Sequence, residues 1–127
     1  MIVAIADTHA TISRLGSAAS AFIDDTIARG DHIGVSAITI AEMVYLIEKG
    51  RIPATALNEL HTATADSGAV LRHVPFDQNV AMKMTQVPRH EVPDLPDRVI
   101  GATALFYSVP VLSRDSRIRS SSIRTIW

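Results

Sequence analysis

Four acidic residues in this 127-residue chain stand where they could act together: Asp7, Glu42, Asp97 and Asp115. Carboxylates gathered in a partly desolvated crevice repel one another, and their pKa values rise unless a cation compensates the charge. Mg²⁺ or Mn²⁺ suits such an oxygen-rich site, because these ions keep several waters and also bind substrate phosphates. A metal-bound water can act as a hydroxide-like nucleophile near neutral pH. The chemistry that these residue types favour is therefore metal-assisted hydrolysis of a phosphodiester bond.

Apolar runs of strand type alternate with helical patterns along the whole chain. We expect strands at residues 2–6, 32–35, 70–74, 109–113 and 124–127. We expect helices at 18–29, 39–49, 54–67, 77–84 and 97–107, with the proline-containing segment 87–96 as an irregular loop. This alternation predicts one three-layer α/β/α domain over residues 1–127 with a mostly parallel central sheet.

Ligands of such sheets bind beyond the carboxyl ends of the strands, and the acids follow those ends. Asp7 directly follows the first expected strand, and Asp115 follows the 109–113 strand after one further residue, Arg114. Glu42 is expected in the first turn of its helix, and Asp97 opens the last helix three residues after Asp94. We therefore expect these side chains at one edge of the sheet.

Each acid also has a purely structural interpretation. Asp94 and Asp97 could cap a helix, and Asp7 and Asp115 could be turn residues. Glu42 is harder to explain in this way, because apolar residues surround it near the start of its helix. The functional prediction depends on the four acids taken together.

Composition excludes several other kinds of site. The chain has no cysteine, which rules out disulfides, thiolate zinc sites and cysteine nucleophiles, and its five histidines lack zinc-site spacing. The net charge of -1 does not favour a general polyanion binder. No apolar stretch approaches the roughly 20 residues that a spanning helix needs, and Asp7 ends the N-terminal apolar run too early for a signal peptide. We therefore expect a cytoplasmic protein with no membrane segment.

Two features keep alternative interpretations open. The late arginines, Arg114, Arg117, Arg119 and Arg124, could bind phosphates or form a solvated surface. His9, two residues after Asp7, could reach the crevice or be structural.

Two other classes with acids at strand ends do not fit. A phospho-receiver domain needs a lysine late in the chain, whereas the only lysines are Lys49 and Lys83. A phosphatase with an aspartate nucleophile needs a second aspartate two positions after Asp7, where His9 stands.

Four segments together give the chain a family resemblance. They are residues 6–10 (ADTHA), 35–42 (VSAITIAE), 94–104 (DLPDRVIGATA) and 111–115 (VLSRD). With these segments in this order, the chain resembles a PIN domain over essentially its whole length, and within that group the VapC toxins of bacterial toxin–antitoxin pairs. The 118–127 tail is similar to the closing strand of that group.

The resemblance implies an Mg²⁺- or Mn²⁺-dependent endoribonuclease with Asp7, Glu42, Asp97 and Asp115 as its acidic quartet. Asp7 and Asp97 would ligate the metal directly and Asp94 would support them. Thr8 and Ser113 would sit beside quartet members, where they could hold a metal-bound water or a phosphate oxygen, or else bond to local backbone.

The resemblance also implies partners: an RNA substrate, a cognate VapB-like antitoxin and a second copy in a homodimer.

The chain departs from many relatives at residues 11–13, where they have large apolar residues, and at Ser113, where they have threonine. Met43, Val44 and Ile47 are expected in the core or a dimer interface, and Trp127 is expected to pack. A catalytically weak PIN domain that binds nucleic acid or a partner is the alternative, and a DNA-directed nuclease also stays open.

Overall fold

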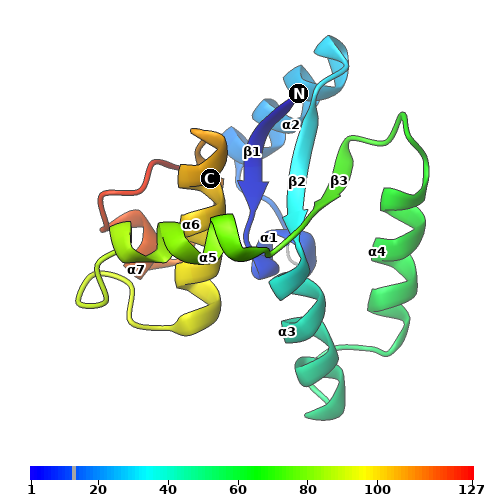
Figure 1. Cartoon of the computed structure of the whole chain (residues 1–127). Helices are drawn as coiled ribbons and strands as arrows, with labels where there is room; N and C mark the ends of the chain where they lie inside the picture. The colour runs from blue at the N-terminus through cyan, green and yellow to red at the C-terminus, as the bar shows by residue number, and fades with distance from the viewer. Residues whose placement is uncertain (13) are drawn as a thin grey trace.

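A computed structural model describes residues 1–12 and 14–127. These residues form five strands: β1 (Ile2–Ala6), β2 (His32–Ser36), β3 (Leu71–Val74), β4 (Val111–Leu112) and β5 (Thr125–Ile126). The helices are α1 (Thr8–Ile12), α2 (Ser17–Arg29), α3 (Ala37–Glu48), α4 (Thr55–Ala65), α5 (Gln78–Lys83), α6 (Leu95–Tyr107) and α7 (Ser116–Arg119), and Met84–Gln86 form a 3-10 turn (Figure 1). Ser13, one of the positions at which the chain departs from many relatives, lies outside the described residues.

The strands form one parallel sheet in the order β3-β2-β1-β4-β5. β1 is central and pairs with β2 on one side and β4 on the other, with Ala6 beside both Val35 and Leu112. Because all five strands run the same way, their carboxyl ends meet at one edge. The expected α/β/α fold with a parallel sheet is confirmed.

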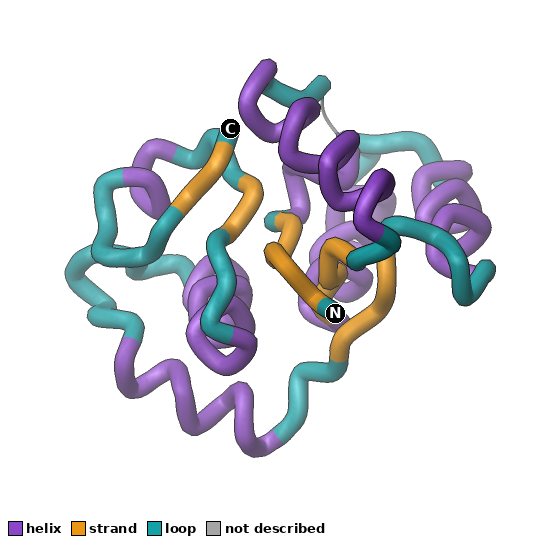
Figure 2. The backbone as a smooth tube through the Cα atoms, turned by 90° about the horizontal axis from the view of Figure 1, so that it is seen from above, coloured by secondary structure: helices purple, strands orange, loops and turns teal. Residues whose placement is uncertain are grey.

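Helices cover both faces of this sheet (Figure 2). Alternate residues of β1 divide between the faces, since Ala4 and Ala6 pack with Phe22 and Ile23 of α2, whereas Ile5 packs with Ile100 of α6. α4 lies on the α2 side, where Leu60 packs with Val35 and Met43. The inner strands β1, β2 and β4 are largely buried on both faces, which explains why they are mostly apolar, whereas the edge strand β3 exposes Arg72 and His73.

The expected elements are present, with changed boundaries. α2 ends before Gly30, whose φ of 73° is the left-handed conformation that favours glycine at a helix end. Asp77 caps α5 by accepting a hydrogen bond from the Val80 N–H at 3.1 Å, as predicted. Trp127 packs as expected, because it lies against Gly16.

Several predicted boundaries are wrong in ways that affect the acids. α3 begins at Ala37 because the Ser36 hydroxyl caps it, so Glu42 lies in the second turn and not the first. α6 begins at Leu95, and Asp97 is therefore not its opening residue. Strand 109–113 is reduced to β4, and the sequence analysis does not predict α1 or α7. No helix in the described part of the chain is long and apolar enough to cross a bilayer.

Candidate functional site at the carboxyl edge of the sheet

Asp7 lies at the carboxyl end of the central strand and is only 3% exposed. Its backbone N–H extends the β1–β4 ladder by bonding to the Leu112 carbonyl at 3.1 Å. One carboxylate oxygen accepts a hydrogen bond from the Ala10 N–H at 2.8 Å and so starts α1, while the other accepts one from the Ser113 hydroxyl. The turn interpretation of Asp7 is thus correct, yet it leaves a buried carboxylate at the sheet edge.

Ser113 connects Asp7 to Asp115. Its side chain is fully buried. The hydroxyl donates a hydrogen bond to the Asp7 carboxylate and accepts one from the Asp115 N–H at 3.0 Å. Asp115 in turn caps α7, with 2.8 Å to the Arg117 N–H and 3.4 Å to the Ile118 N–H. One hydroxyl therefore fixes two acidic segments that are more than 100 residues apart in sequence.

Thr8 has the same role on the other side of Asp7. Its buried hydroxyl donates to Glu42 Oε1 and lies 3.4 Å from the hydroxyl of Thr39, which is also buried. The sequence analysis did not single out Thr39. Its spacing of three residues before Glu42, which predicts a shared helix face, is the signal that could have found it.

The first turn of α6 brings two further acids to the edge. Asp94 caps this helix, since its Oδ1 accepts a hydrogen bond from the Asp97 N–H at 3.1 Å. Asp94 and Glu42 both line a recess of about 320 Å³ together with Ile38, Ala41, Tyr45 and Pro96. The cap interpretation therefore holds for Asp94 but not for Asp97.

Asp97 has the most strongly altered acidity in the group. Burial, as the largest cause, and then the negative charges of Asp94, Asp115, Glu42 and Asp7, in that order, together raise its pKa from 3.8 to about 7. All five acids thus share one electrostatic environment, as the sequence analysis expected. A half-buried carboxyl that titrates near neutrality is the kind of group found at functional sites.

Burial also raises the pKa of Glu42. The Thr8 hydrogen bond opposes this shift, as does the nearby charge of His9, whereas Asp94 and Asp7 reinforce it. His9 therefore lies close enough to the crevice to act on Glu42 electrostatically.

Within the described residues, no basic side chain forms an ion pair with the five acids at this edge. Among the same residues, no group of three histidine, aspartate or glutamate side chains lies close enough to hold one metal ion. Four of the carboxylates instead accept hydrogen bonds from the hydroxyls of Thr8 and Ser113 or from backbone N–H groups, and Asp97 has no such bond among the described residues.

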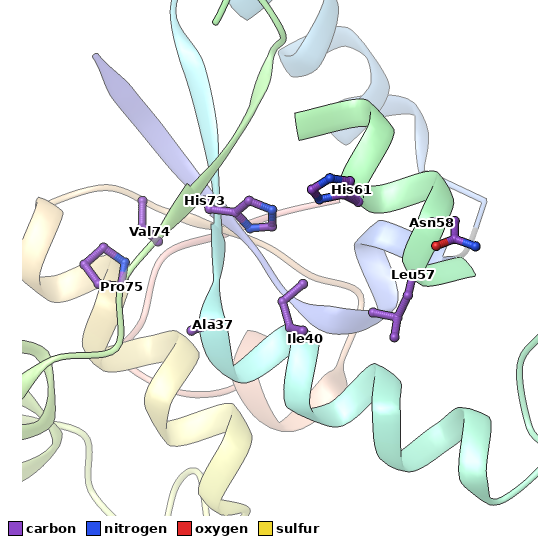
Figure 3. Close-up of a pocket in the computed structure, with 8 residues that line it drawn as sticks. All are labelled: Ala37, Ile40, Leu57, Asn58, His61, His73, Val74 and Pro75. Carbon is purple, nitrogen blue, oxygen red and sulfur yellow. The ribbon is translucent and has the colours of Figure 1, made fainter. Parts of the chain in front are cut away.

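A separate cavity of about 700 Å³ lies between α3, α4 and β3 (Figure 3). Its lining is apolar apart from Asn58, His61 and His73, and the ring of His73 is hydrogen bonded to Thr64 at 2.8 Å. None of the five acids lines it. The carboxyl edge is therefore the better candidate for hydrolytic chemistry, although its recess is smaller.

The parallel sheet with helices on both faces and a crowded acidic edge defines a three-layer α/β domain with a candidate hydrolytic site. A model of the PIN domain family matches residues 4–122, and the chain belongs to this family. PIN domains are in general nucleases, which supports assignment of the chain to the hydrolases at the level of class.

Solved structures resemble the chain over nearly its full length. VapBC2 from Rickettsia felis, bound to a DNA fragment from its promoter, contains a chain of 12% identity with a TM-score of 0.71, covering 98% of this chain and 97% of that chain. DNA-bound VapBC from Salmonella typhimurium gives 19% identity, a TM-score of 0.69 and coverage of 98% and 97%. These two likenesses establish the fold alone.

FitAcB from Neisseria gonorrhoeae gives a higher identity of 26%, with a TM-score of 0.61 and coverage of 98% and 96%. No curated protein sequence matches the chain. The resemblance to PIN domains inferred from the sequence is confirmed by the family match.

Proposed function

We propose that this protein is a metal-dependent endoribonuclease that acts as the toxin of a toxin–antitoxin pair. The observation that carries the proposal is the shared environment of five acids at the carboxyl edge of a PIN fold, where Asp97 has a pKa of about 7. Residues 1–127 would act as one nuclease unit.

The donor set fits a hard divalent cation. PIN nucleases generally use divalent metals, and the edge offers oxygen donors with excess negative charge that no ion pair of the described residues relieves. We assign Asp7 and Asp97 as direct ligands of Mg²⁺ or Mn²⁺, with Glu42 and Asp115 completing the site. Because no three acids of the described residues lie within reach of one ion, their side chains must draw together on binding.

The bound ion would supply an activated water and neutralise charge on the phosphorus oxygens. The protein's own residues orient this centre. Ser113 holds Asp7 and the Asp115 backbone, Thr8 holds Glu42, and Asp94 holds the first turn of α6 that carries Asp97. Hydrolysis by water would leave 5′-phosphate and 3′-hydroxyl ends.

An antitoxin of VapB type is the partner we propose. Three of the similar solved structures are described as VapBC or FitAcB assemblies, and a fourth as a toxin–antitoxin complex from Klebsiella pneumoniae. Such a pair would function in the cytoplasm, where RNA is the available substrate.

The test is cleavage of end-labelled RNA, and of DNA of the same sequence, by the purified chain with Mg²⁺, Mn²⁺ or EDTA. Asp7→Asn and Asp97→Asn should each lower cleavage by on the order of 100-fold or more, because each removes a charged ligand. Asp24→Asn, an exposed acid of α2, is the matched control and reveals contaminating nuclease.

Metal-dependent cleavage of RNA that both site variants lose and the control retains supports the proposal. Equal cleavage by all variants, or none by the parent with any metal, favours the alternative of a PIN domain that only binds nucleic acid or a partner. Cleavage restricted to DNA would contradict the choice of substrate.

A homodimer is supported by large apolar side chains at the surface. Tyr45 of α3 is 57% exposed, and Met82 of α5 is 63% exposed, with Phe76 before α5 at 40%. Exposed aromatic and methionine side chains are common at protein–protein interfaces. Met82→Glu should convert dimer to monomer in light scattering, whereas Ile27→Glu on α2 should not. A monomeric parent would contradict the proposal.

A further inference from the structure

Four exposed arginines near the C-terminal end of the chain have no role in the proposed chemistry. They are Arg114, Arg117, Arg119 and Arg124, and within the described residues none forms an ion pair or donates a side-chain hydrogen bond. Arg98, by contrast, donates to the carbonyls of Val87 at 3.2 Å and Met84 at 2.8 Å. The guanidinium groups of the four exposed arginines therefore keep their donors for a ligand.

The backbone places Arg114 and Arg117 at one location and Arg124 at another. The Val111 N–H bonds to the Arg124 carbonyl at 2.9 Å, so Arg124 lies beside the start of β4. Arg114 follows Ser113 beyond the end of β4, and the Arg117 N–H bonds to the Asp115 carboxylate at 2.8 Å. The backbone thus places Arg114 and Arg117 on either side of Asp115 in the segment that reaches the acidic edge, whereas Arg124 lies beside the amino-terminal end of β4.

An acidic edge repels a polyanion, and the net charge of -1 gives no general attraction to compensate. Binding of a phosphate chain therefore needs cations placed locally beside the acids. Guanidinium groups suit this purpose because their planar forks bind phosphate oxygens with two hydrogen bonds.

We propose that Arg114 and Arg117 bind the phosphates of single-stranded RNA adjacent to the bond that is cut, and that Arg124 does not take part. The proposal rests on the proposed nuclease function for the position of that bond. Arg114 and Arg117 are positioning residues, since they hold the chain and do not touch the reacting atoms.

Binding is tested first, with a fluorescent mixed-sequence RNA and Mg²⁺ in an Asp7→Asn background that keeps the RNA intact. Arg114→Gln and Arg117→Gln should each lower affinity roughly fivefold or more and reduce the slope of log affinity against log salt by about 0.7 for each phosphate that is no longer neutralised. Arg124→Gln removes the same charge from the other location, and its RNA affinity and salt slope should equal those of the Asp7→Asn protein.

Equal affinities and slopes for the three variants, or an equal loss for Arg124→Gln, would overturn the proposal, because only general charge would then matter. Absence of RNA binding by the background protein would overturn it as well. An unchanged RNA affinity combined with weakened antitoxin binding would assign these arginines to an acidic protein partner instead.

Kinetics then separates this proposal from the nuclease assignment. In the otherwise unchanged chain, Arg114→Gln should raise KM by a similar factor and retain kcat, because the guanidinium binds the phosphate equally well in the ground state and the transition state. Loss of kcat at constant KM would overturn the positioning role. If the parent binds through Arg114 and Arg117 but cuts nothing, the nuclease assignment fails and the RNA-binding surface stands.

Discussion

Ser113 and Thr8 each donate a hydroxyl hydrogen bond to an acid that forms no ion pair within the described residues. In this way Asp7 and Glu42 stay fixed near the edge without being neutralised by a basic side chain. Asp97 receives no comparable hydrogen bond among the described residues, and its pKa of about 7 reflects burial and four acidic neighbours. The ionised Asp97 carboxylate therefore lowers the stability of the folded protein at a pH above about 7, where the proposed function needs this charge.

Replacement of Asp97 should stabilise the metal-free protein. The folded pKa of about 7 lies above the unfolded value of 3.8, so the folded state binds the proton more tightly and stability falls as pH rises from about 4 to 7. At about 1.4 kcal/mol per pKa unit, discounted for partial exposure, Asp97→Asn should raise the free energy of unfolding at pH 8 by on the order of 1–3 kcal/mol.

Urea unfolding in EDTA at pH 5 and pH 8 measures this effect. The stabilisation should be smaller at pH 5, and Asp24→Asn should show no such difference. A gain that is the same at both pH values would mean that the charge of Asp97 is not its cause.

Ser113→Ala should destabilise the fold, because Asp7 and the Asp115 N–H each lose a buried partner. The expected loss in free energy of unfolding is about 1–3 kcal/mol. Ser113→Thr keeps the hydroxyl and should restore most of it, together with metal-dependent cleavage. If alanine and threonine behave alike in thermal unfolding, the hydroxyl has no such role.

At the scale of elements, parallel pairing of β1 with β2 and β4 brings the ends of distant segments to one edge. The closing segment also packs on the start of α2, where a Cβ added to Gly16 would lie 2.6 Å from Trp127 Cδ1 and 2.8 Å from its backbone carbon. Because both the ring and the backbone of Trp127 would be in the way, a Cβ at this position could be accommodated only if Trp127 shifts, whereas glycine fits without a shift.

Gly16→Ala should displace Trp127 and destabilise the protein by about 1–3 kcal/mol, in the range of overpacked sites. Trp127 is the only tryptophan, so its emission should shift to longer wavelength as the ring becomes more exposed. Gly68→Ala is the control, since its added Cβ would meet only Asp66 Oδ1 at an ordinary 3.7 Å. Unchanged emission and melting temperature for Gly16→Ala would show that Trp127 packs elsewhere.

For the whole molecule, a metal that binds only the folded state should add to stability by mass action. Mg²⁺ at about 100 times its dissociation constant adds about 2.7 kcal/mol, and it should remove most of the decline between pH 5 and pH 8. Asp7→Asn should abolish both effects, while Asp24→Asn should retain them. Thermal unfolding with graded Mg²⁺ or EDTA checks this, and an equal Mg²⁺ response in parent and Asp7→Asn would place the ion elsewhere.

Features that depend on neighbours along the chain could be predicted from the amino-acid sequence. Apolar runs predicted the strands, Gly30 and Asp77 marked helix boundaries, and Asp7 was recognised as the residue after a buried strand. These signals are local, since side-chain periodicity and capping need only a few consecutive residues. The short helices α1 and α7 were missed because each is held by one capping aspartate and has too few turns to show a period.

How the acids are held, and why the pKa values of Glu42 and Asp97 are raised, depends on contacts that form only in the folded protein. The bonds from Ser113 to Asp7 and from Thr8 to Glu42 join segments 106 and 34 residues apart, which no local pattern reports. The raised pKa of Asp97 depends on burial and on four charges from separate elements. Such interactions exist only after the chain has folded, because sheet pairing, and not sequence proximity, brings these groups together.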